Sequence, residues 1–372
     1  MLFRSLGGNV NGTTNEDRTW YYEVVPSNFL ERTLYMEADR FGNLLAAMDQ
    51  AKLDNQRDVV KNERRFRVDN VPYGTMGERI DELIYPESHP YHHSVIGSME
   101  DLSAASLDDV KNFFRTYYVP NNTVLVLSGD FNEKQARTWI DKYFGKIKTG
   151  AAINRPNPPM PTLTSVIRKQ YEDPFAQLSR VVLTWPGVRE YHPDEPALDI
   201  LASVLSTGRG SRLQSNLVYG KELAQQIFAS DGTSEIGGEF QITATARPQK
   251  SLDDIEQEIN KEIERIKTDG VTADEVSRAV SGREAQAIFN LQTVLGKGSR
   301  LADYAVYAGK PNYFQQDLDR YLKVTPADVK RVANQYLGAG HVVMAYVPAK
   351  TPPPPAATDK PASTETKKKD TA

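Results

Sequence analysis

The chain has 372 residues, enough for two or three domains that each bury a core. Its 45 Lys and Arg residues against 49 Asp and Glu residues give a net charge of −4, which excludes a nucleic-acid binder that works through a basic surface. No apolar run approaches the roughly 20 residues of a membrane-spanning helix. The absence of cysteine excludes disulfides, thiolate metal sites and Cys nucleophiles, and five histidines leave few places for imidazole chemistry.

An internal repeat with an offset near 220 residues organises the sequence. The segment NGTT at 11–14 is echoed by DGTS at 231–234, which stands 220 positions later. In each copy an alternating, strand-like segment follows and ends at a proline, at 19–26 and at 240–248. The apolar spacing then predicts an amphipathic helix, over 28–48 in the first copy and 251–267 in the second.

The two copies agree again near their ends. SLDDVK at 106–111 matches TPADVK at 325–330, and both begin with a Ser or Thr N-cap that is followed three residues later by an acid. Each predicted helix leads into an apolar segment, at 123–128 and at 341–346, which we expect to be a strand. Blocks that keep their order and spacing indicate one fold used twice, rather than chance similarity of helix caps.

The repeat and the proline content set the expected domain limits. We expect a first domain over 1–148, a Pro-rich linker over 149–161, a homologous second domain over 162–350, and a disordered Pro/Thr/Lys-rich tail over 351–372. The second domain holds a predicted strand at 181–185, and helical segments near 197–205 and 211–219, before its DGTS block. Only ten residues precede the NGTT block, so the first domain is expected to be incomplete and to lack its first strand and helix.

A series of short segments resembles the insulinase/pitrilysin family of zinc metallopeptidases, most nearly its short bacterial members with two homologous domains. These segments span most of residues 7–350: GGNVNGTTNEDRT (7–19), YEVVP (22–26), ADR (38–40), VVKNERR (59–65), NVPYG (70–74), VIGSMEDL (95–102), YYVPNN (117–122) and SRL (211–213). The resemblance implies an α+β fold of two homologous domains, each a mostly antiparallel sheet with helices on one face. It also implies hydrolysis of peptides or unfolded segments in a cavity between them.

The same resemblance implies an inverted-zincin metal site. In the family, two His of an HxxEH helix bind Zn²⁺, the Glu between them takes a proton from zinc-bound water, and a downstream Glu is the third protein ligand. This sequence contains no HxxEH, and the segment expected to carry it is the one that the repeat indicates is missing. We therefore expect zinc in the full-length parent but none at the catalytic site of this chain, which we expect to be inactive.

By resemblance, Glu63 in the VVKNERR segment matches the third zinc ligand. Composition alone favours a plainer interpretation, in which Glu63 is a helix carboxylate paired with Arg64 or Arg67. Many members carry a second, accessory acid seven residues earlier. That position is Gln56 here, so the charge of the accessory acid is absent from it.

The resemblance further places Asn11 and Gly12 on an edge strand that binds extended peptide substrate through its backbone. A plain Asn-Gly turn is the alternative. In the family's second domain, or in its partner chain, an Arg and a Tyr seven residues apart often contact the substrate. Val218 and Gln225 stand at those places, so we expect a second, separate insulinase-family subunit to supply the pair.

Two further interpretations are open. A naturally non-catalytic partner or scaffold subunit of a heterodimeric peptidase would lack HxxEH, and so would a core subunit of a larger assembly, as respiratory-chain relatives show. The His-rich segment at 89–93 is expected to be a surface loop rather than a metal site, and 208–211 to connect two helices. Because many relatives are exported, the periplasm is the compartment expected for the full-length parent.

Overall fold

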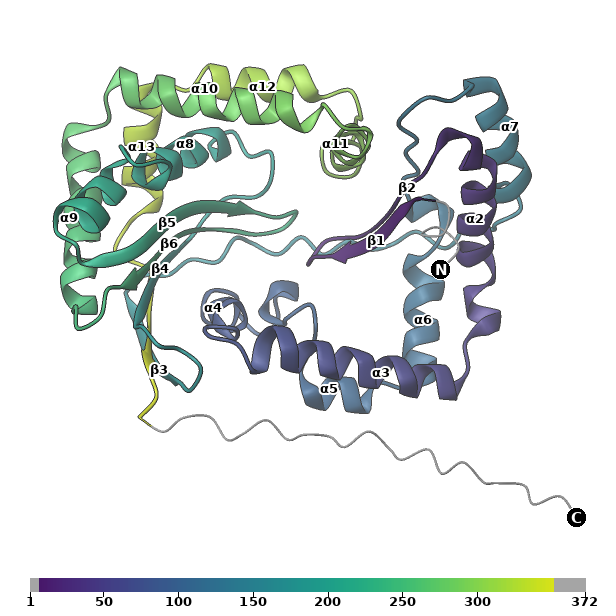
Figure 1. Cartoon of the computed structure of the whole chain (residues 1–372), viewed down its shortest axis with the longest axis horizontal. Coiled ribbons are helices and arrows are strands. Elements are labelled where there is room, and N and C mark those ends of the chain that lie inside the picture. Colours follow the sequence, from purple (N-terminus) through teal and green to yellow (C-terminus); the bar gives the residue numbers. More distant parts are fainter. Residues whose placement is uncertain (1–6, 351–372) are drawn as a thin grey trace, which may run out of the picture.

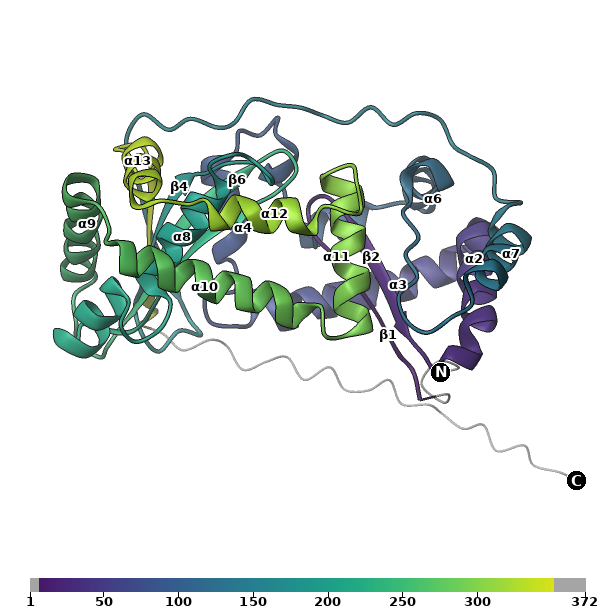
Figure 2. The same cartoon turned by 90° about the horizontal axis from the view of Figure 1, so that it is seen from above.

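The computed structural model describes residues 7–350, which form a mixed α+β structure of two halves (Figure 1). We call residues 7–148 the N-terminal half and residues 162–350 the C-terminal half. The segment between helix α7 (Glu133–Phe144) and strand β3 (Ile167–Asp173) is without helix or strand and passes along one side of both halves (Figure 2). None of the helices in this part of the chain has the length and apolar character needed to cross a bilayer.

The C-terminal half is built on a five-stranded sheet in the order β3-β7-β4-β6-β5. Strands β3 and β7 are parallel, and the other neighbouring pairs are antiparallel. Its other elements are β4 (Arg180–Pro186), α8 (Glu195–Ser206), η5 (Gln214–Gly220), β5 (Ala224–Thr233), β6 (Gly238–Ala246), α9 (Leu252–Asp269), α10 (Ala273–Asn290), α11 (Val294–Tyr307), α12 (Phe314–Leu322), α13 (Pro326–Tyr336) and β7 (Val342–Pro348). The strands expected at 181–185, 240–248 and 341–346 are therefore present.

Strand β4 is buried along its whole centre because both of its faces are covered. Val181, Leu183 and Trp185 point to one face and join the main core with α8, α9 and α13. Val182 points to the opposite face, as the alternation of a strand requires, and joins a second core. A strand buried on both faces reads as a continuous apolar run, which is why the pattern at 181–185 was recognisable in the sequence.

The N-terminal half has only a two-stranded sheet, of β1 (Asn9–Thr14) and β2 (Thr19–Val24), among the residues described. Its helical elements are η1 (Ser27–Phe29), α2 (Leu30–Ala47), α3 (Gln50–Arg64), η2 (Arg65–Asp69), α4 (Met76–Ile84), η3 (Pro90–His92), α5 (Met99–Ala104), α6 (Leu107–Tyr117), η4 (Pro120–Asn122) and α7. Helix α2 packs on α7. Capping boxes begin both α6, at Ser106, and α13, at Thr325, as the matched segments predicted.

The strand expected at 123–128 does not form, and this prediction is wrong. The equivalent strand in the C-terminal half, β7, pairs with β4 along Arg180–Thr184. Among the described residues of the N-terminal half, no strand takes the place of β4. The apolar segment 123–128 therefore has no ladder partner and does not form a strand, because a strand needs a neighbour to bond with.

Each half packs one helix on the sheet of the other half. Helix α4 of the N-terminal half lies on β4 and β7, so that Ile80 and Ile84 pack on Val182 and Met344 in the second core. Helix α11 of the C-terminal half lies on β2 in turn. Helices were expected on one face of each sheet, and the second face of the larger sheet is in addition closed by the opposite half (Figure 1).

The His-rich segment at 89–93 is part of this boundary and not the surface loop that we expected. The His89 side chain is buried and stacks on Tyr85, with 4.6 Å between ring centroids, and burial lowers the pKa of His89. The Tyr91 hydroxyl donates to Asp17 and accepts a hydrogen bond of 3.0 Å from the Ile236 amide. The turn of the β1–β2 hairpin is thus tied to the turn of the β5–β6 hairpin.

Two half-buried carboxyl groups lie at the same boundary. Burial, followed by the nearby charge of Glu16, raises the pKa of Glu239 on β6 from 4.5 to about 7. Burial raises the pKa of Asp81 on α4 to about 8, and the charge of Glu239 adds to this effect. The folded chain therefore holds protons here that the unfolded chain releases near pH 4.5.

We predict that the contribution of these retained protons to the free energy of unfolding is present below about pH 4.5 and is lost as the pH rises through about 7. Glu239→Gln should flatten the decline between pH 5 and 8, measured by urea denaturation. A smaller slope should remain from the other carboxyl groups whose pKa is raised to about 7 or 8, which are Glu23, Asp81, Glu190 and Asp231. Glu264→Gln on α9, at an exposed carboxylate paired with Lys267, is the control and should not change the slope. Parallel profiles for Glu239→Gln and the unmodified chain would contradict the prediction.

Candidate functional site

Helix α3 carries the candidate metal ligand, Glu63, in its last turn. The helix begins at an N-cap, Asp49, whose side chain accepts a hydrogen bond of 2.9 Å from the Lys52 amide. Beyond Arg64 the backbone widens into a π-turn, η2, before the chain turns into α4. Arg64, next to Glu63, donates to Glu78 on α4, and α4 packs on the C-terminal sheet.

Glu63 and its neighbour Arg64 have different surroundings. The Glu63 side chain is 40% exposed, and its partner is Arg67, with 3.2 Å between Nε and Oε1. Arg64 is only 11% exposed and donates to Glu78 at 2.6 Å and to the Gly97 carbonyl at 2.7 Å. The plainer interpretation of Glu63 as the partner of Arg67 therefore describes the present contact, and that contact is open to solvent.

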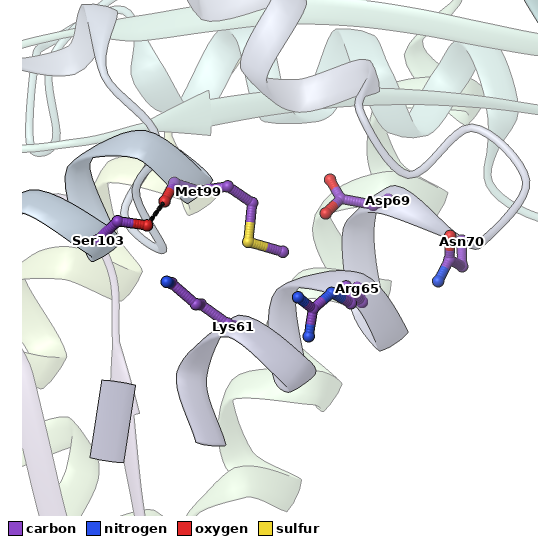
Figure 3. A pocket seen from close by; sticks show the side chains of 6 residues that line it. All are labelled: Lys61, Arg65, Asp69, Asn70, Met99 and Ser103. Carbon is purple, nitrogen blue, oxygen red and sulfur yellow. Dashed lines mark hydrogen bonds between the residues drawn. The ribbon is translucent and has the colours of Figure 1, made fainter. Parts of the chain in front are cut away.

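The side of α3 toward α5 faces a pocket. A pocket of about 490 Å³ lies there between the two helices, lined by Lys61, Arg65, Asp69, Asn70, Met99 and Ser103 (Figure 3). Lys61 and Arg65 each stand two residues from Glu63, a spacing of about 200° around a helix. Glu63 therefore belongs to the opposite face of α3, away from this pocket.

That opposite face is a stripe of exposed residues. Gln56, Val59, Glu63 and Phe66 recur at spacings of three and four residues, so they share one face of α3 and η2. Val59 is 50% exposed and Phe66 is 78% exposed, although both are large apolar residues. The sequence interpretation missed Val59 and Phe66, and their helical spacing to Glu63 was the signal that could have found them.

The C-terminal half shows what the corresponding face contacts there. At an offset of 220, Glu63 corresponds to Arg283 on α10. Arg283 donates to Asp199 on α8 at 2.6 Å and to the Tyr321 hydroxyl at 3.0 Å. A helix thus lies against this face in the C-terminal copy of the fold, and α8 is that helix.

The residues present do not fit a zinc ion. Within residues 7–350, no group of three or more His, Asp and Glu side chains is arranged to hold a metal. Zinc requires three protein ligands in addition to water, and Glu63 would supply one. His89 stacks on Tyr85 and His92 bonds to the Tyr85 carbonyl, so neither joins Glu63 in a group that could hold a metal.

Asn11 and Gly12 lie in strand β1, so the plain Asn-Gly turn is not what the chain forms. The only strand that β1 pairs with among the described residues is β2, and its other edge is therefore open. The Gly12 amide bonds to the Asn11 side chain at 2.9 Å, and a Cβ at Gly12 would lie 3.3 Å from the Tyr21 ring. An open edge with a small residue can pair with an extended peptide.

We expected Val218 and Gln225 to lie on one helix, but the structure places them on different elements. Val218 is buried near the end of η5, whereas Gln225 lies in β5 at a bulge. The helical segment ends at Gly220, and the chain then turns into the strand. These two side chains are therefore not presented together on one helix face.

Known proteins share this architecture. The family model described as "Peptidase M16 inactive domain" matches residues 104–283. The zinc protease PqqE of Helicobacter pylori is 31% identical over 344 residues, which cover 90% of this chain and 75% of that protein. The chain belongs to the insulinase/pitrilysin family of M16 peptidases.

A protease of known crystal structure from Helicobacter pylori matches the fold with a TM-score of 0.85 and 28% identity, over 93% of this chain and 84% of that one. The uncharacterized zinc protease YmxG of Bacillus subtilis is 22% identical, over 90% of this chain and 79% of its own length.

In this M16 chain, Glu63 and Arg64 are adjacent but should differ in their effect on stability. Arg64→Ala should lower the free energy of unfolding by about 2–4 kcal/mol, because Glu78 and the Gly97 carbonyl lose a shielded partner. Glu63→Gln should change it by less than about 0.5 kcal/mol, since its ion pair is exposed. Urea denaturation at pH 7 measures both. A large loss in Glu63→Gln would make Glu63 a structural residue.

Proposed function

We propose that this chain is a fragment of a zinc-dependent metalloendopeptidase that hydrolyses peptides or unfolded segments between two homologous domains. The observation that carries the proposal is Glu63, which matches the family's third zinc ligand and lies on an exposed face of α3. The corresponding face in the C-terminal half contacts a helix. In the complete enzyme, we infer, the HxxEH helix occupies that place beside Glu63.

The proposal includes the division of the chain. The N-terminal domain would cover residues 1–148 and the C-terminal domain 162–350, with 149–161 as linker and 351–372 as tail. In support, residues 149–161 contain no helix or strand. The residues of the tail lie outside those that the structure describes. The names of the relatives, which are zinc proteases, support zinc as the cofactor of the complete protein.

The 372-residue chain is proposed to be inactive, because Glu63 alone cannot hold zinc. Its remaining contribution would be to bind substrate. The open edge of β1 at Asn11 and Gly12 would add an extended peptide as a further strand, with the backbone supplying affinity. At the accessory position, Gln56 offers no carboxylate, so it can neither take a proton nor lower the local potential as an acid would.

A second candidate function is that of a naturally non-catalytic partner or scaffold subunit of a heterodimeric M16 peptidase. Two observations favour it: HxxEH is absent from the sequence, and Gln56 replaces the accessory acid. In either case a separate insulinase-family subunit would provide the Arg and Tyr that Val218 and Gln225 cannot. The retained Glu63 favours the first candidate, because a scaffold has no use for a zinc ligand.

The coding sequence upstream of Met1 separates the two candidates. An in-frame HxxEH would identify the fragment, and the restored chain should then hold one zinc ion, measured by elemental analysis, and cleave unfolded casein. Glu63→Gln in the restored chain should weaken zinc binding at least tenfold. Asp58→Asn, at another carboxylate of α3, is the matched control and should retain zinc.

Two other outcomes would identify the second candidate or contradict the proposed inactivity of the chain. A complete upstream strand and helix without HxxEH would leave the partner subunit. The 372-residue chain itself should retain no stoichiometric zinc after dialysis and should not cleave casein. Chelator-sensitive cleavage by that chain would contradict the proposed inactivity.

A further inference from the structure

One row of side chains crosses the whole sheet of the C-terminal half. Its members stand opposite one another on neighbouring strands and therefore share one face of the sheet: Tyr171 on β3, Tyr346 on β7, Arg180 on β4, Thr245 on β6 and Gln226 on β5. Val182, two residues after Arg180, points to the same side and packs with α4, so this face is turned toward the opposite half (Figure 1). We call Arg180, Thr245 and Gln226 the Arg180 cluster.

Arg180 lies in this cluster without an acidic partner. Its Cζ lies over the Tyr73 ring, 3.6 Å from the ring centroid, and its Nε donates to the Thr245 hydroxyl at 3.0 Å. Within residues 7–350 it forms no ion pair, and the nearby Asp173 carboxylate is held by three backbone amides instead. Burial lowers the pKa of the Arg180 guanidinium, and the nearby Tyr73 and Asp173 offset only part of this effect.

Two other shielded arginines of this chain bond to carboxylates. Arg64 and Arg212 are 11% and 18% exposed, and they donate to Glu78 and Glu275. A guanidinium that has lost part of its hydration is stabilised by a carboxylate, which can accept two of its N–H groups. Within the described part of the chain, both terminal nitrogens of Arg180 are without a hydrogen-bond partner. They are therefore free to bind a carboxylate from outside the chain.

A bulge in β5 brings a second donor to Arg180. The register of β5 against β6 shifts between Ala224 and Gln226, so that Gln226 stands opposite Thr245. The Gln226 side-chain nitrogen is 3.4 Å from the Thr245 hydroxyl, which is the oxygen that the Arg180 Nε also contacts. Thr245 is only 4% exposed, whereas Gln226 is exposed to solvent. A guanidinium and an amide therefore meet over one buried hydroxyl.

The orientation of Arg180 is fixed by the ring beneath it. The Tyr73 hydroxyl donates to the Leu178 carbonyl at 2.6 Å, and the Tyr73 amide donates to Asp173 at 2.6 Å. Tyr73 also has a positive φ of 60°, a backbone conformation that occurs often at ligand sites. A cation that is stacked on an immobile ring loses little freedom when a ligand binds, so less of the binding energy is lost.

An exposed aromatic ring lies beside the cluster. Phe228 is two residues from Gln226 on β5, so it points to the same side of the sheet, and it is 54% exposed. Two residues of an extended chain span about 7 Å. A bound peptide with its carboxylate at Arg180 could therefore place an apolar side chain, two residues away, on Phe228.

We propose that the Arg180 cluster and Phe228 bind an acidic peptide segment through a carboxylate, either in a side chain or at the C-terminus. The carboxylate would accept hydrogen bonds from the terminal nitrogens of Arg180 and from the Gln226 amide, and an apolar side chain would cover Phe228. Charge complementarity favours this ligand, because the charge in the cluster that no described residue compensates is positive. The inference needs no metal, so it is independent of the proposed peptidase function.

Three acetylated hexapeptides are the probes, and isothermal titration calorimetry on the full chain is the measurement. Gly-Leu-Ala-Glu-Ala-Gly amide carries a side-chain carboxylate, Gly-Ala-Gly-Leu-Ala-Gln with a free C-terminus carries a terminal one, and Gly-Leu-Ala-Gln-Ala-Gly amide carries none. At least one of the two acidic peptides should bind at least tenfold more tightly than the third, and the one that does identifies the source of the carboxylate. Equal affinity of all three peptides, or binding by none, would overturn the proposal.

Variants of the chain test where the peptide binds. Arg180→Gln should weaken binding at least tenfold, because the positive charge is lost. Gln226→Glu should do the same at an exposed position that tolerates the change, since it places the chain's own carboxylate beside Arg180. Arg209→Gln is the control and should have no effect, because Arg209 stacks on Tyr219 outside the cluster. Unchanged binding by Gln226→Glu, or equal weakening by Arg209→Gln, would contradict the assignment.

Discussion

The packing of α4 on the sheet of the opposite half is the contact on which the arrangement of the molecule depends. Ile80 and Ile84 close a face of the sheet that the helices of the C-terminal half leave open. The segment before α4 is held as well, since the Tyr73 amide donates to Asp173 at 2.6 Å and its hydroxyl donates to the Leu178 carbonyl at 2.6 Å. Tyr73 adopts a positive φ of 60° to do so. Gly74 is required next to it, because a Cβ there would lie 2.0 Å from the Val68 carbonyl oxygen.

This anchor also explains why a helix with few buried contacts keeps a defined place. Helix α3 has no fully buried residue, yet it runs into α4 through η2. Arg64 ties its last turn to Glu78 on α4, so the end that carries Glu63 is oriented by the C-terminal half. The carboxylate that we propose as a zinc ligand of the complete enzyme is thus held by a neighbouring element of fixed position, as a preorganised site requires. The exposed face of α3 is therefore compatible with a defined site.

The sequence predicted those parts of the fold that local chemistry determines. Ser106 and Thr325 begin helices because the hydroxyl and the acid three residues later satisfy free amides within one turn. The segment 123–128 has an equally clear apolar pattern, but a strand depends on a neighbour that is remote in the sequence. The prediction of a surface loop at 89–93 failed for the same reason. His89 stacks on Tyr85, and Tyr91 bonds to the turn of the opposite hairpin. Glu63 came from the resemblance to the family, whereas the exposure of Val59 and Phe66 beside it is visible only in three dimensions.

The segment 123–128 has a consequence for the behaviour of the chain in concentrated solution. Its sequence, TVLVLS, combines β-branched and apolar residues and contains neither charge nor proline. Unpaired, apolar and uncharged segments of this length are typical starting points of cross-β aggregation. Pro120 on one side and Asp130 on the other limit the stretch that can stack between identical molecules. The tendency of the chain to aggregate in concentrated solution should therefore depend on these two flanking residues.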